Sequence, residues 1–372
     1  MSAAALIFAD SFDVDLDTLT EKRTLAAVPF GARYRVIDFM ISSLVNSGVK
    51  NIGIVTTQKY HSLMNHVRAG AAWDLDRKRS GVTFLPPYST GSRHSVFENR
   101  LEAMQNNLTY LRQISDEYVI FTACNYVGNV DFHRMYEAHV QSRADITGLY
   151  TNKPVNKQAI LPVTEYSIAE DGTVRDVRIE TGHEPGMKIA ANTYIVDRQL
   201  LLGELEASYR AGKKSFRRDV LMPLVNKGSV RGYEAQETLL FLDDTSCYLK
   251  SNLDLLRREI RDEIFHKEGS PIVTRVKDSA PTRYGAEAKA VNSLIADGAI
   301  IEGEVRNSII FRGVRIKKGA VVENSVVLQD TTVGEYARLN YAVLDKNAFI
   351  NDGRMLSGYI THPFYVGHHV II

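Results

Sequence analysis

Four carboxylates near the start of the chain have the spacing of a possible cation site: Asp10, Asp13, Asp15 and Asp17. Alternate carboxylates can bind calcium, but the glycine and the closing glutamate of a calcium-binding EF-hand loop are missing here. The surrounding stretch, residues 9–20, contains no glycine that would let the backbone approach a phosphate chain. These residue types favour an acidic surface loop over a calcium site or a nucleotide-binding turn.

The acidic loop lies between a predicted strand and a predicted turn, where α/β folds place phosphate-binding turns. The strand covers residues 5–8, and the turn at 29–31 leads into a helix at 40–47. Short apolar runs alternate with helical patterns up to about residue 255. This alternation predicts a mostly parallel sheet that binds ligands at the carboxyl ends of its strands. The other predicted strands cover 51–56, 81–85, 118–123, 146–150 and 189–196, and a second helix covers 101–115.

From Ile295 onward, short aliphatic runs alternate with small or polar residues. Three related segments centre on Ser308, Ser325 and Ala342, with spacings of 325 − 308 = 17 and 342 − 325 = 17. A period of 17 is close to three hexapeptides, which make one coil of a left-handed parallel β-helix. The alternative is a short antiparallel sheet in which the repetition is accidental.

The length of 372 residues indicates two domains. We predict a first domain over 1–255, a helix and linker over 256–290, and a second domain over 291–372. The net charge of +1 gives no general attraction to nucleic acid or to an anionic membrane.

The two cysteines, Cys124 and Cys247, lie in segments with the pattern of buried structure. They indicate a reducing compartment and not a disulfide framework or a metal site. The sequence contains no apolar run of about 18 residues and no secretion signal. We therefore expect a cytoplasmic protein with no nucleic-acid or membrane partner.

The segment VPFGARYRVIDF at residues 28–39 is the best indicator of a family, together with 44–49 and 60–63. These segments resemble those of nucleotide-sugar pyrophosphorylases, and most closely those of ADP-glucose pyrophosphorylases (glucose-1-phosphate adenylyltransferases). The resemblance covers nearly the whole chain. It implies an α/β fold, a Rossmann-like nucleotidyltransferase domain with a mostly parallel sheet, followed by a C-terminal left-handed parallel β-helix. The shared second domain favours the β-helix over the antiparallel sheet.

The nucleotide-binding residues of that family are replaced in this chain. Its glycine-rich loop carries an arginine at the position of Asp15, and its phosphate-contacting lysine corresponds to Leu25. An aspartate about 5 Å from a phosphate charge costs on the order of 3 kcal/mol at an effective dielectric of about 20. Loss of a transition-state arginine lowers a phosphoryl-transfer rate by about 10³ to 10⁵. Arg100 falls where the family seats adenine and would obstruct it; Arg100 could also be the exposed first turn of a helix, which is compatible with that obstruction.

The metal and sugar-phosphate positions differ as well. The family's catalytic, magnesium-binding aspartate corresponds to Asn125, which could otherwise be a turn residue after a strand. Its second metal-binding aspartate falls on Phe241, unless a two-residue shift supplies Asp243. Its sugar-phosphate lysine falls on Glu180 in an ungapped alignment, and a gap would shift that position by one. An amide brings no negative charge to magnesium, so we expect no metal or cofactor on this chain.

A cleft between the two domains holds an effector phosphate in catalytic relatives. Lys22 and Arg35 fall on basic positions that line this cleft in some of them, and Arg312 and Arg315 could face these residues from the β-helix. The alternative is that the charges are solvated or, for Arg35, part of a buried ion pair. Lys317 and Lys318 belong to the same basic group and fit a solvated face equally well.

This combination resembles the non-catalytic, D-type subunit of a bacterial ADP-glucose pyrophosphorylase. The resemblance implies a heterotetramer of glycogen biosynthesis, whose catalytic subunit uses Mg²⁺ to make ADP-glucose from ATP and glucose 1-phosphate. A phosphorylated metabolite would act as effector. One alternative is a weakly active nucleotidyltransferase with a rebuilt site, using Asp243, Asp131 and Glu102. Another is a stand-alone metabolite sensor.

Overall fold

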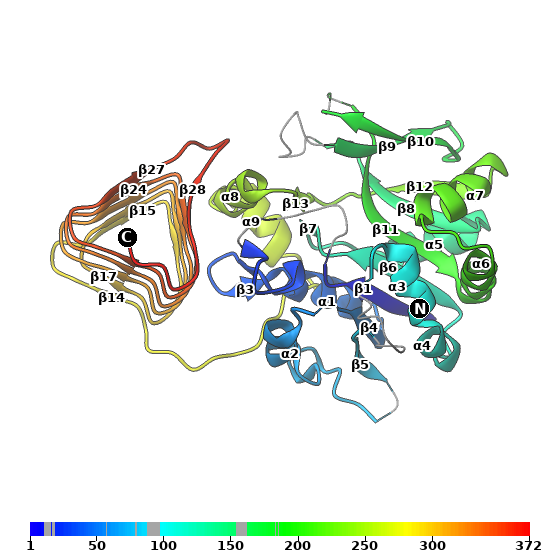
Figure 1. Cartoon of the computed structure of the whole chain (residues 1–372), viewed down its shortest axis with the longest axis horizontal. Coiled ribbons are helices and arrows are strands. Elements are labelled where there is room, and N and C mark those ends of the chain that lie inside the picture. Colours follow the sequence, from blue (N-terminus) through cyan, green and yellow to red (C-terminus); the bar gives the residue numbers. More distant parts are fainter. Residues whose placement is uncertain are drawn as a thin grey trace.

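The computed structural model describes residues 1–10, 16, 19–56, 58–78, 80–87, 97–153, 162–182, 184 and 186–372. An α/β domain occupies the N-terminal two-thirds of the chain, and a three-sided stack of short strands follows it (Figure 1). The side of the stack that contains β28 is turned toward the α/β domain in Figure 1. None of the helices among these residues is long and apolar enough to cross a membrane.

A nine-stranded sheet forms the centre of the α/β domain, with the path β10-β9-β11-β6-β1-β4-β5 and with β8 and β12 attached through β11. Strands β5, β4, β1 and β6 pair in parallel, whereas β11 pairs antiparallel with β6, β8 and β9. The side of the sheet formed by β5, β4, β1 and β6 is thus parallel, and the sheet is mixed beyond β6. The strands are β1 (Ala3–Phe8), β4 (Asn51–Val55), β5 (Gly81–Leu85), β6 (Tyr118–Ala123), β8 (Ile146–Thr151), β9 (Pro162–Ile168), β10 (Val174–Thr181), β11 (Ile189–Asp197) and β12 (Val230–Glu234).

Helices pack on both faces of this sheet, and two predicted helices differ from the observed ones. The helix predicted at 40–47 is α1, and it begins at Val36 because the Asp38 carboxylate accepts the backbone N–H of Arg35 at 2.9 Å. The helix predicted at 101–115 is two helices, because the chain leaves helical geometry at Asn107, whose side-chain amide donates to the Ala103 carbonyl at 2.8 Å. The helices are α1 (Val36–Asn46), α2 (His61–Val67), α3 (Arg100–Asn106), α4 (Leu108–Gln113), α5 (Phe132–Ser142), α6 (Arg198–Arg210), α7 (Met222–Asn226), α8 (Thr245–Asp254) and α9 (Arg258–Phe265).

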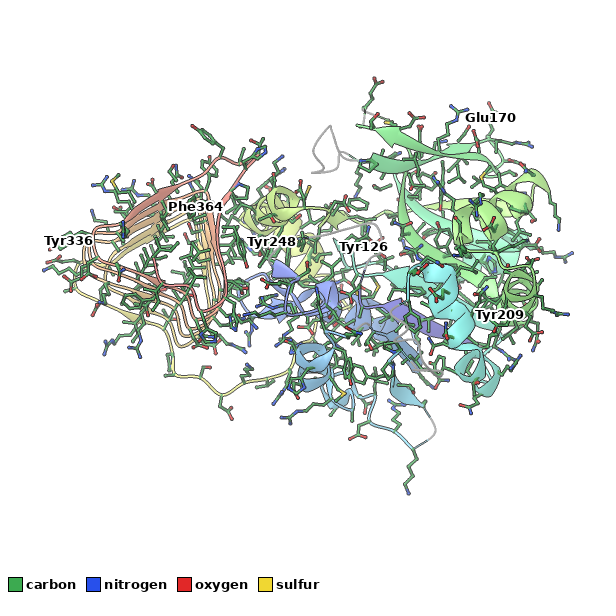
Figure 2. All side chains as sticks on the ribbon, viewed as in Figure 1. Tyr126, Glu170, Tyr209, Tyr248, Tyr336 and Phe364 are labelled. Atoms are coloured by element: carbon green, nitrogen blue, oxygen red, sulfur yellow. The ribbon has the colours of Figure 1, made fainter. Side chains whose placement is uncertain are left out.

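Two apolar clusters fill the interior. One lies under α3, α4, α6 and α7 on one face of the sheet. The other covers the opposite face and continues without a break into the β-helix. Tyr126 and Tyr248 are buried in the molecule, whereas Tyr209 and Tyr336 mark exposed positions at opposite ends of its long axis (Figure 2). Because one core spans both domains, the β-helix is packed onto the α/β domain.

The C-terminal stack is the predicted left-handed β-helix. Its three sheets are β14-β17-β20-β23-β26, β15-β18-β21-β24-β27 and β16-β19-β22-β25-β28, and all neighbouring strands are parallel. Ile309 pairs with Val326, and Val326 with Val343, which is the 17-residue period. Asn307 and Asn324 adopt left-handed φ values of 44° and 48° at the same corner of successive coils. Asparagine tolerates this conformation better than other non-glycine residues, so it suits a sharp corner.

The β-helix strands begin at β14 (Arg283–Tyr284). The segment predicted as helix and linker, 256–290, therefore contains α9, an extended stretch and the first strands of the β-helix. The remaining strands are β15 (Lys289–Val291), β16 (Leu294–Ile295), β17 (Ile300–Ile301), β18 (Glu304–Arg306), β19 (Ile309–Ile310), β20 (Arg315–Ile316), β21 (Val321–Glu323), β22 (Val326–Val327), β23 (Thr332–Val333), β24 (Arg338–Asn340), β25 (Ala342–Leu344), β26 (Phe349–Ile350), β27 (Met355–Ser357) and β28 (Phe364–Val366).

Candidate functional site

Asn125, which we predicted to stand at the position of the family's catalytic aspartate, lies directly after β6. Asn125 is 2% exposed, and its side-chain oxygen has no hydrogen-bond partner among the described residues. Its backbone carbonyl accepts the N–H of Leu242 at 2.8 Å, which joins β7 (Tyr126–Val127) to β13 (Leu240–Phe241). Phe241 is fully buried in this small sheet. A neutral amide beside a buried phenylalanine does not fit magnesium, which prefers carboxylate and phosphate oxygens.

The carboxylates proposed for a rebuilt site are used mostly for capping helices. Asp131 accepts the backbone N–H groups of His133 and Arg134 at the start of α5, at 3.1 and 3.2 Å. Glu102 accepts the backbone N–H of Glu98 at 2.7 Å. Asp243 is one residue beyond the hydrogen bond that joins Leu242 to Asn125, so the chain brings it close to the end of β6. Within the described ranges, no group of three or more His, Cys, Asp or Glu residues could hold a metal ion.

Two residues that we predicted to replace nucleotide-binding residues of the family, Leu25 and Arg100, lie beside the end of β1. Leu25 is 2% exposed in the apolar core, and its backbone N–H donates to the Asp10 carboxylate at 2.9 Å. The Arg100 guanidinium lies over the ring of Phe8, 5.6 Å from its centroid, and its Nε is buried. Arg100 is therefore both the first residue of α3 and a bulky group above the end of β1, so the two sequence-based interpretations are compatible. Asp15, with Asp13 and Asp17, lies outside the described residues.

Glu180 lies on β10, the last strand on one side of the sheet, and is paired with Val163 of β9. It is half-buried, and its neighbour Ile179 is 54% exposed. If Glu180 stands where we predicted the family's sugar-phosphate lysine, its carboxylate gives a local charge that opposes a phosphate.

A second candidate site lies where the two domains meet, and its anchor is a buried ion pair. Both terminal nitrogens of Arg23 donate to the carboxylate of Asp345, at 2.8 and 2.9 Å, and the two residues are 4% and 1% exposed. Asp345 occupies the β-helix column of Phe311 and Leu328, since 328 − 311 = 17 and 345 − 328 = 17. Arg23 neutralises a carboxylate that would otherwise be buried among apolar side chains.

Arg35 lies at the same boundary and is held without an ion pair among the described residues. Its Nη1 donates to the Ser62 carbonyl at 2.7 Å and to the Ser62 hydroxyl at 2.9 Å. The nearby Asp38 carboxylate is instead 2.6 Å from Nε2 of His66. Burial lowers the pKa of Arg35 to about 10, and Arg23 and Arg275 lower it further against the opposing effect of Asp38. The guanidinium is therefore positively charged and only partly compensated.

The β-helix contributes a column of polar residues at this boundary, one from each of three coils: Arg312, Gln329 and Lys346, again 17 apart. Arg312 donates through Nε to Asp297 at 3.0 Å, and its Nη2 is buried without a partner among the described residues. The side-chain oxygen of Gln329 is likewise buried without a hydrogen-bond partner among the described residues. Unsatisfied buried polar atoms in one column indicate a place where a polar ligand or water is bound.

Lys346 and Lys277 complete the cationic group. Burial lowers the pKa of Lys346 to about 7, with further contributions from Arg35 and Arg23, while Asp345 acts in the opposite direction. Burial also lowers the pKa of Lys277, followed by the effects of Arg35 and Arg312. We call Arg23, Arg35, Lys277, Arg312 and Lys346 the interdomain cation cluster. Its electrostatic field favours an anion.

The structure brings together two of the four residues predicted for an effector phosphate, Arg35 and Arg312. Lys22 and Arg315 are exposed, and no hydrogen bond or ion pair recorded among the described residues joins either of them to the cluster. Lys317 and Lys318 pair with carboxylates on the β-helix surface, at 3.7 and 3.3 Å. Sequence reasoning missed Arg23, Lys277 and Lys346. Two steps of the 17-residue period from Arg312 lead to Lys346, so this spacing could have identified it.

Comparison with known proteins agrees with this architecture. Residues 15–233 match the nucleotidyl transferase family, and residues 278–358 match the GlmU-like, C-terminal hexapeptide family. The chain is similar to the glucose-1-phosphate adenylyltransferases of Bacillus mycoides, Bacillus anthracis and Bacillus cereus (strain Q1), with 30% identity over 357 residues in each case. The aligned part covers 95% of this chain and 94% of each relative. Similarity that extends over both domains means that this chain belongs to the glucose-1-phosphate adenylyltransferase family.

Proposed function

We propose that this chain is the regulatory, catalytically inactive D-type subunit of a glucose-1-phosphate adenylyltransferase. It pairs with a catalytic subunit in a cytoplasmic heterotetramer of bacterial glycogen biosynthesis. The catalytic subunit binds Mg²⁺ and makes ADP-glucose from ATP and glucose 1-phosphate, and this chain modulates it. The observation that carries the proposal is Asn125, where a neutral, buried amide stands in place of the carboxylate that holds the metal.

Two further positions support the loss of catalysis. Leu25 contributes an apolar side chain to the core where the family has a phosphate-contacting lysine. Arg100 covers Phe8 where the family seats the base. Replacing one phosphoryl-stabilising cation costs about 10³ to 10⁵ in rate, so several replacements together leave negligible turnover.

The interdomain cation cluster supports the regulatory part of the proposal. A phosphorylated metabolite bound there contacts both domains, because Arg23, Arg35 and Lys277 precede the β-helix while Arg312 and Lys346 belong to it. A ligand that binds one arrangement of the two domains better than another shifts their equilibrium. The partner subunit senses that shift through its contacts with this chain.

Co-expression with the catalytic subunit of the same organism tests the proposal. We expect the two chains to purify together with the mass of a heterotetramer, and the pure regulatory chain to show no turnover with magnesium, ATP and glucose 1-phosphate. Turnover within tenfold of a catalytic relative would favour the alternative, a nucleotidyltransferase that uses Asp243 in a rebuilt site. Failure to purify together would favour a stand-alone sensor.

Equilibrium binding tests the cation cluster separately. Inorganic phosphate and a set of sugar phosphates are titrated into the wild type, Arg35→Ala and Arg338→Ala. Arg338 lies exposed on β24 and is the matched control. We expect Arg35→Ala to weaken binding at least tenfold and Arg338→Ala to leave it unchanged. Equal affinity in all three proteins would remove Arg35 from the site.

A further inference from the structure

The interdomain cation cluster contains more positive charge than its surroundings neutralise. Asp345, the carboxylate beside Lys346, already accepts two hydrogen bonds from Arg23, one from the Lys346 backbone at 2.7 Å and one from the Tyr365 hydroxyl at 3.1 Å. The Asp38 carboxylate already contacts Nε2 of His66 and accepts the backbone N–H of Arg35. The Asp297 carboxylate already accepts a hydrogen bond from Nε of Arg312. None of these three carboxylates is left to pair with the Lys346 ammonium, and a fourth, Asp330, acts on Lys277.

We propose that binding of a doubly charged anion to the cluster is coupled to the uptake of one proton by Lys346, so that the affinity of the cleft falls as the pH rises. This inference rests on the function proposed above, because it assumes that the cluster is where the anion binds. It adds a regulatory property: the subunit responds to pH and to metabolite through the same site.

The geometry at Lys346 explains the coupling. Three like charges act on its amine: Arg35 from β3 (Tyr34–Arg35), Arg23 from the loop before α1, and Lys277 from the extended segment before the β-helix. Burial, followed by these like charges, lowers the pKa of Lys346 to about 7, far from the usual value of about 10.4. An anion placed among the same cations reverses the sign of the local field and raises this pKa again.

The other titratable groups near Lys346 change charge outside the pH window of interest. The ring nitrogen Nδ1 of His368 is 2.9 Å from the Lys346 carbonyl, and burial lowers the pKa of His368 below its usual 6.5. Burial likewise lowers the pKa of His66. The pKa of Tyr34 is raised above 10 by burial. Between pH 7 and pH 9, a change in affinity therefore reports on the lysines of the cluster, and the Lys346 variants described below separate Lys346 from Lys277, whose pKa is also lowered by burial.

The sign of the effect follows from linkage. Free protein loses the Lys346 proton as the pH rises through about 7, whereas the complex keeps it to a higher pH. Above pH 7, binding must therefore take a proton from solution, and the association constant falls by up to tenfold per pH unit. Well below pH 7 the lysine is charged in both states, and a phosphate ester begins to lose its own second charge near pH 6.

Calorimetric titration of the full chain with sulfate measures this coupling, because the charge of sulfate is constant over the range. Titrations at pH 7, 8 and 9 use fixed ionic strength and two buffers of different ionisation enthalpy. We expect binding to weaken about 50-fold from pH 7 to pH 9 and to take up close to one proton at pH 8. Inorganic phosphate, titrated in parallel, should approach the same slope between pH 8 and pH 9, where it also carries a nearly constant double charge.

Two variants isolate the lysine. Lys346→Arg keeps the charge throughout, so its affinity, whatever its absolute value, should stay nearly constant from pH 7 to pH 9. Lys346→Gln should bind more weakly and also without pH dependence. Wild-type affinity that stays constant within twofold from pH 7 to pH 9 overturns the proton coupling and leaves the anion site intact. Absence of sulfate and phosphate binding at every pH overturns both the site and the coupling.

Discussion

The ion pair between Arg23 and Asp345 provides a direct test of how the two domains are held together. Arg23→Met removes the guanidinium and leaves a carboxylate that is 1% exposed in the core of the β-helix. Removing one partner of a buried ion pair costs about 3–5 kcal/mol. The hydrogen bonds from Tyr365 and from the Lys346 backbone remain, so we expect a loss of about 3 kcal/mol in the free energy of unfolding.

The reciprocal change and the double variant separate the cost of an unpaired charge from the value of the pair. Asp345→Leu alone leaves Arg23 buried without its acceptor and should cost a similar amount. The double variant places leucine in the column of Phe311 and Leu328 and methionine against it. Apolar replacement of both partners is often neutral or stabilising, so the double variant should recover most of the loss.

Urea unfolding of the four proteins, with Arg338→Met as a surface control, gives the coupling free energy directly. We expect a coupling of at least about 2 kcal/mol and no change in the control. A cost below about 1 kcal/mol for Arg23→Met would refute the reasoning. It would mean that the pair is solvated and that the boundary between the domains opens in solution.

Three further outcomes follow from single positions. The free energy of unfolding of the ligand-free wild type should rise as the pH increases from about 7 toward 10.4, by up to about 1.4 kcal/mol per pH unit. The reason is that the unfolded chain binds the Lys346 proton more tightly than the folded chain does. Urea unfolding of Lys346→Gln should show a smaller rise. Asn125→Asp should leave turnover at least about 10³-fold below that of a catalytic relative in a coupled pyrophosphate assay, because Leu25 still stands where we predict the phosphate-contacting lysine. Turnover close to that of a catalytic relative would contradict the assignment of an inactive subunit. Gly303→Ala should destabilise the protein by about 1–3 kcal/mol in a thermal unfolding assay, because the new Cβ would lie 2.3 Å from the Ala320 carbonyl oxygen. Gly203→Ala in α6 places its Cβ where no atom lies within 4 Å. In the same assay it should stabilise the protein by about 0.5–1 kcal/mol.

Much of the fold was predictable because its signals are local. The 17-residue spacing of Ser308, Ser325 and Ala342 follows from the geometry of a β-helix coil, in which equivalent residues stack. The strand predicted at 118–123 coincides with β6, and every residue of β1 is buried as its apolar sequence indicates. The break at Asn107 was missed because its cause is one side-chain hydrogen bond and not a change in hydrophobic period.

The sequence by itself determined the fold of both parts of the chain, because strand patterns and repeats are local properties, and it predicts the replacements at Asn125 and Leu25. Only the tertiary structure decided which charges face one another. Arg23 and Asp345 are 322 positions apart, and no periodicity within either domain relates them. The charges of Lys22 and Arg23 are the same in the sequence, yet one is exposed and the other is buried, because an arginine can be buried only where a fold supplies it with an acceptor.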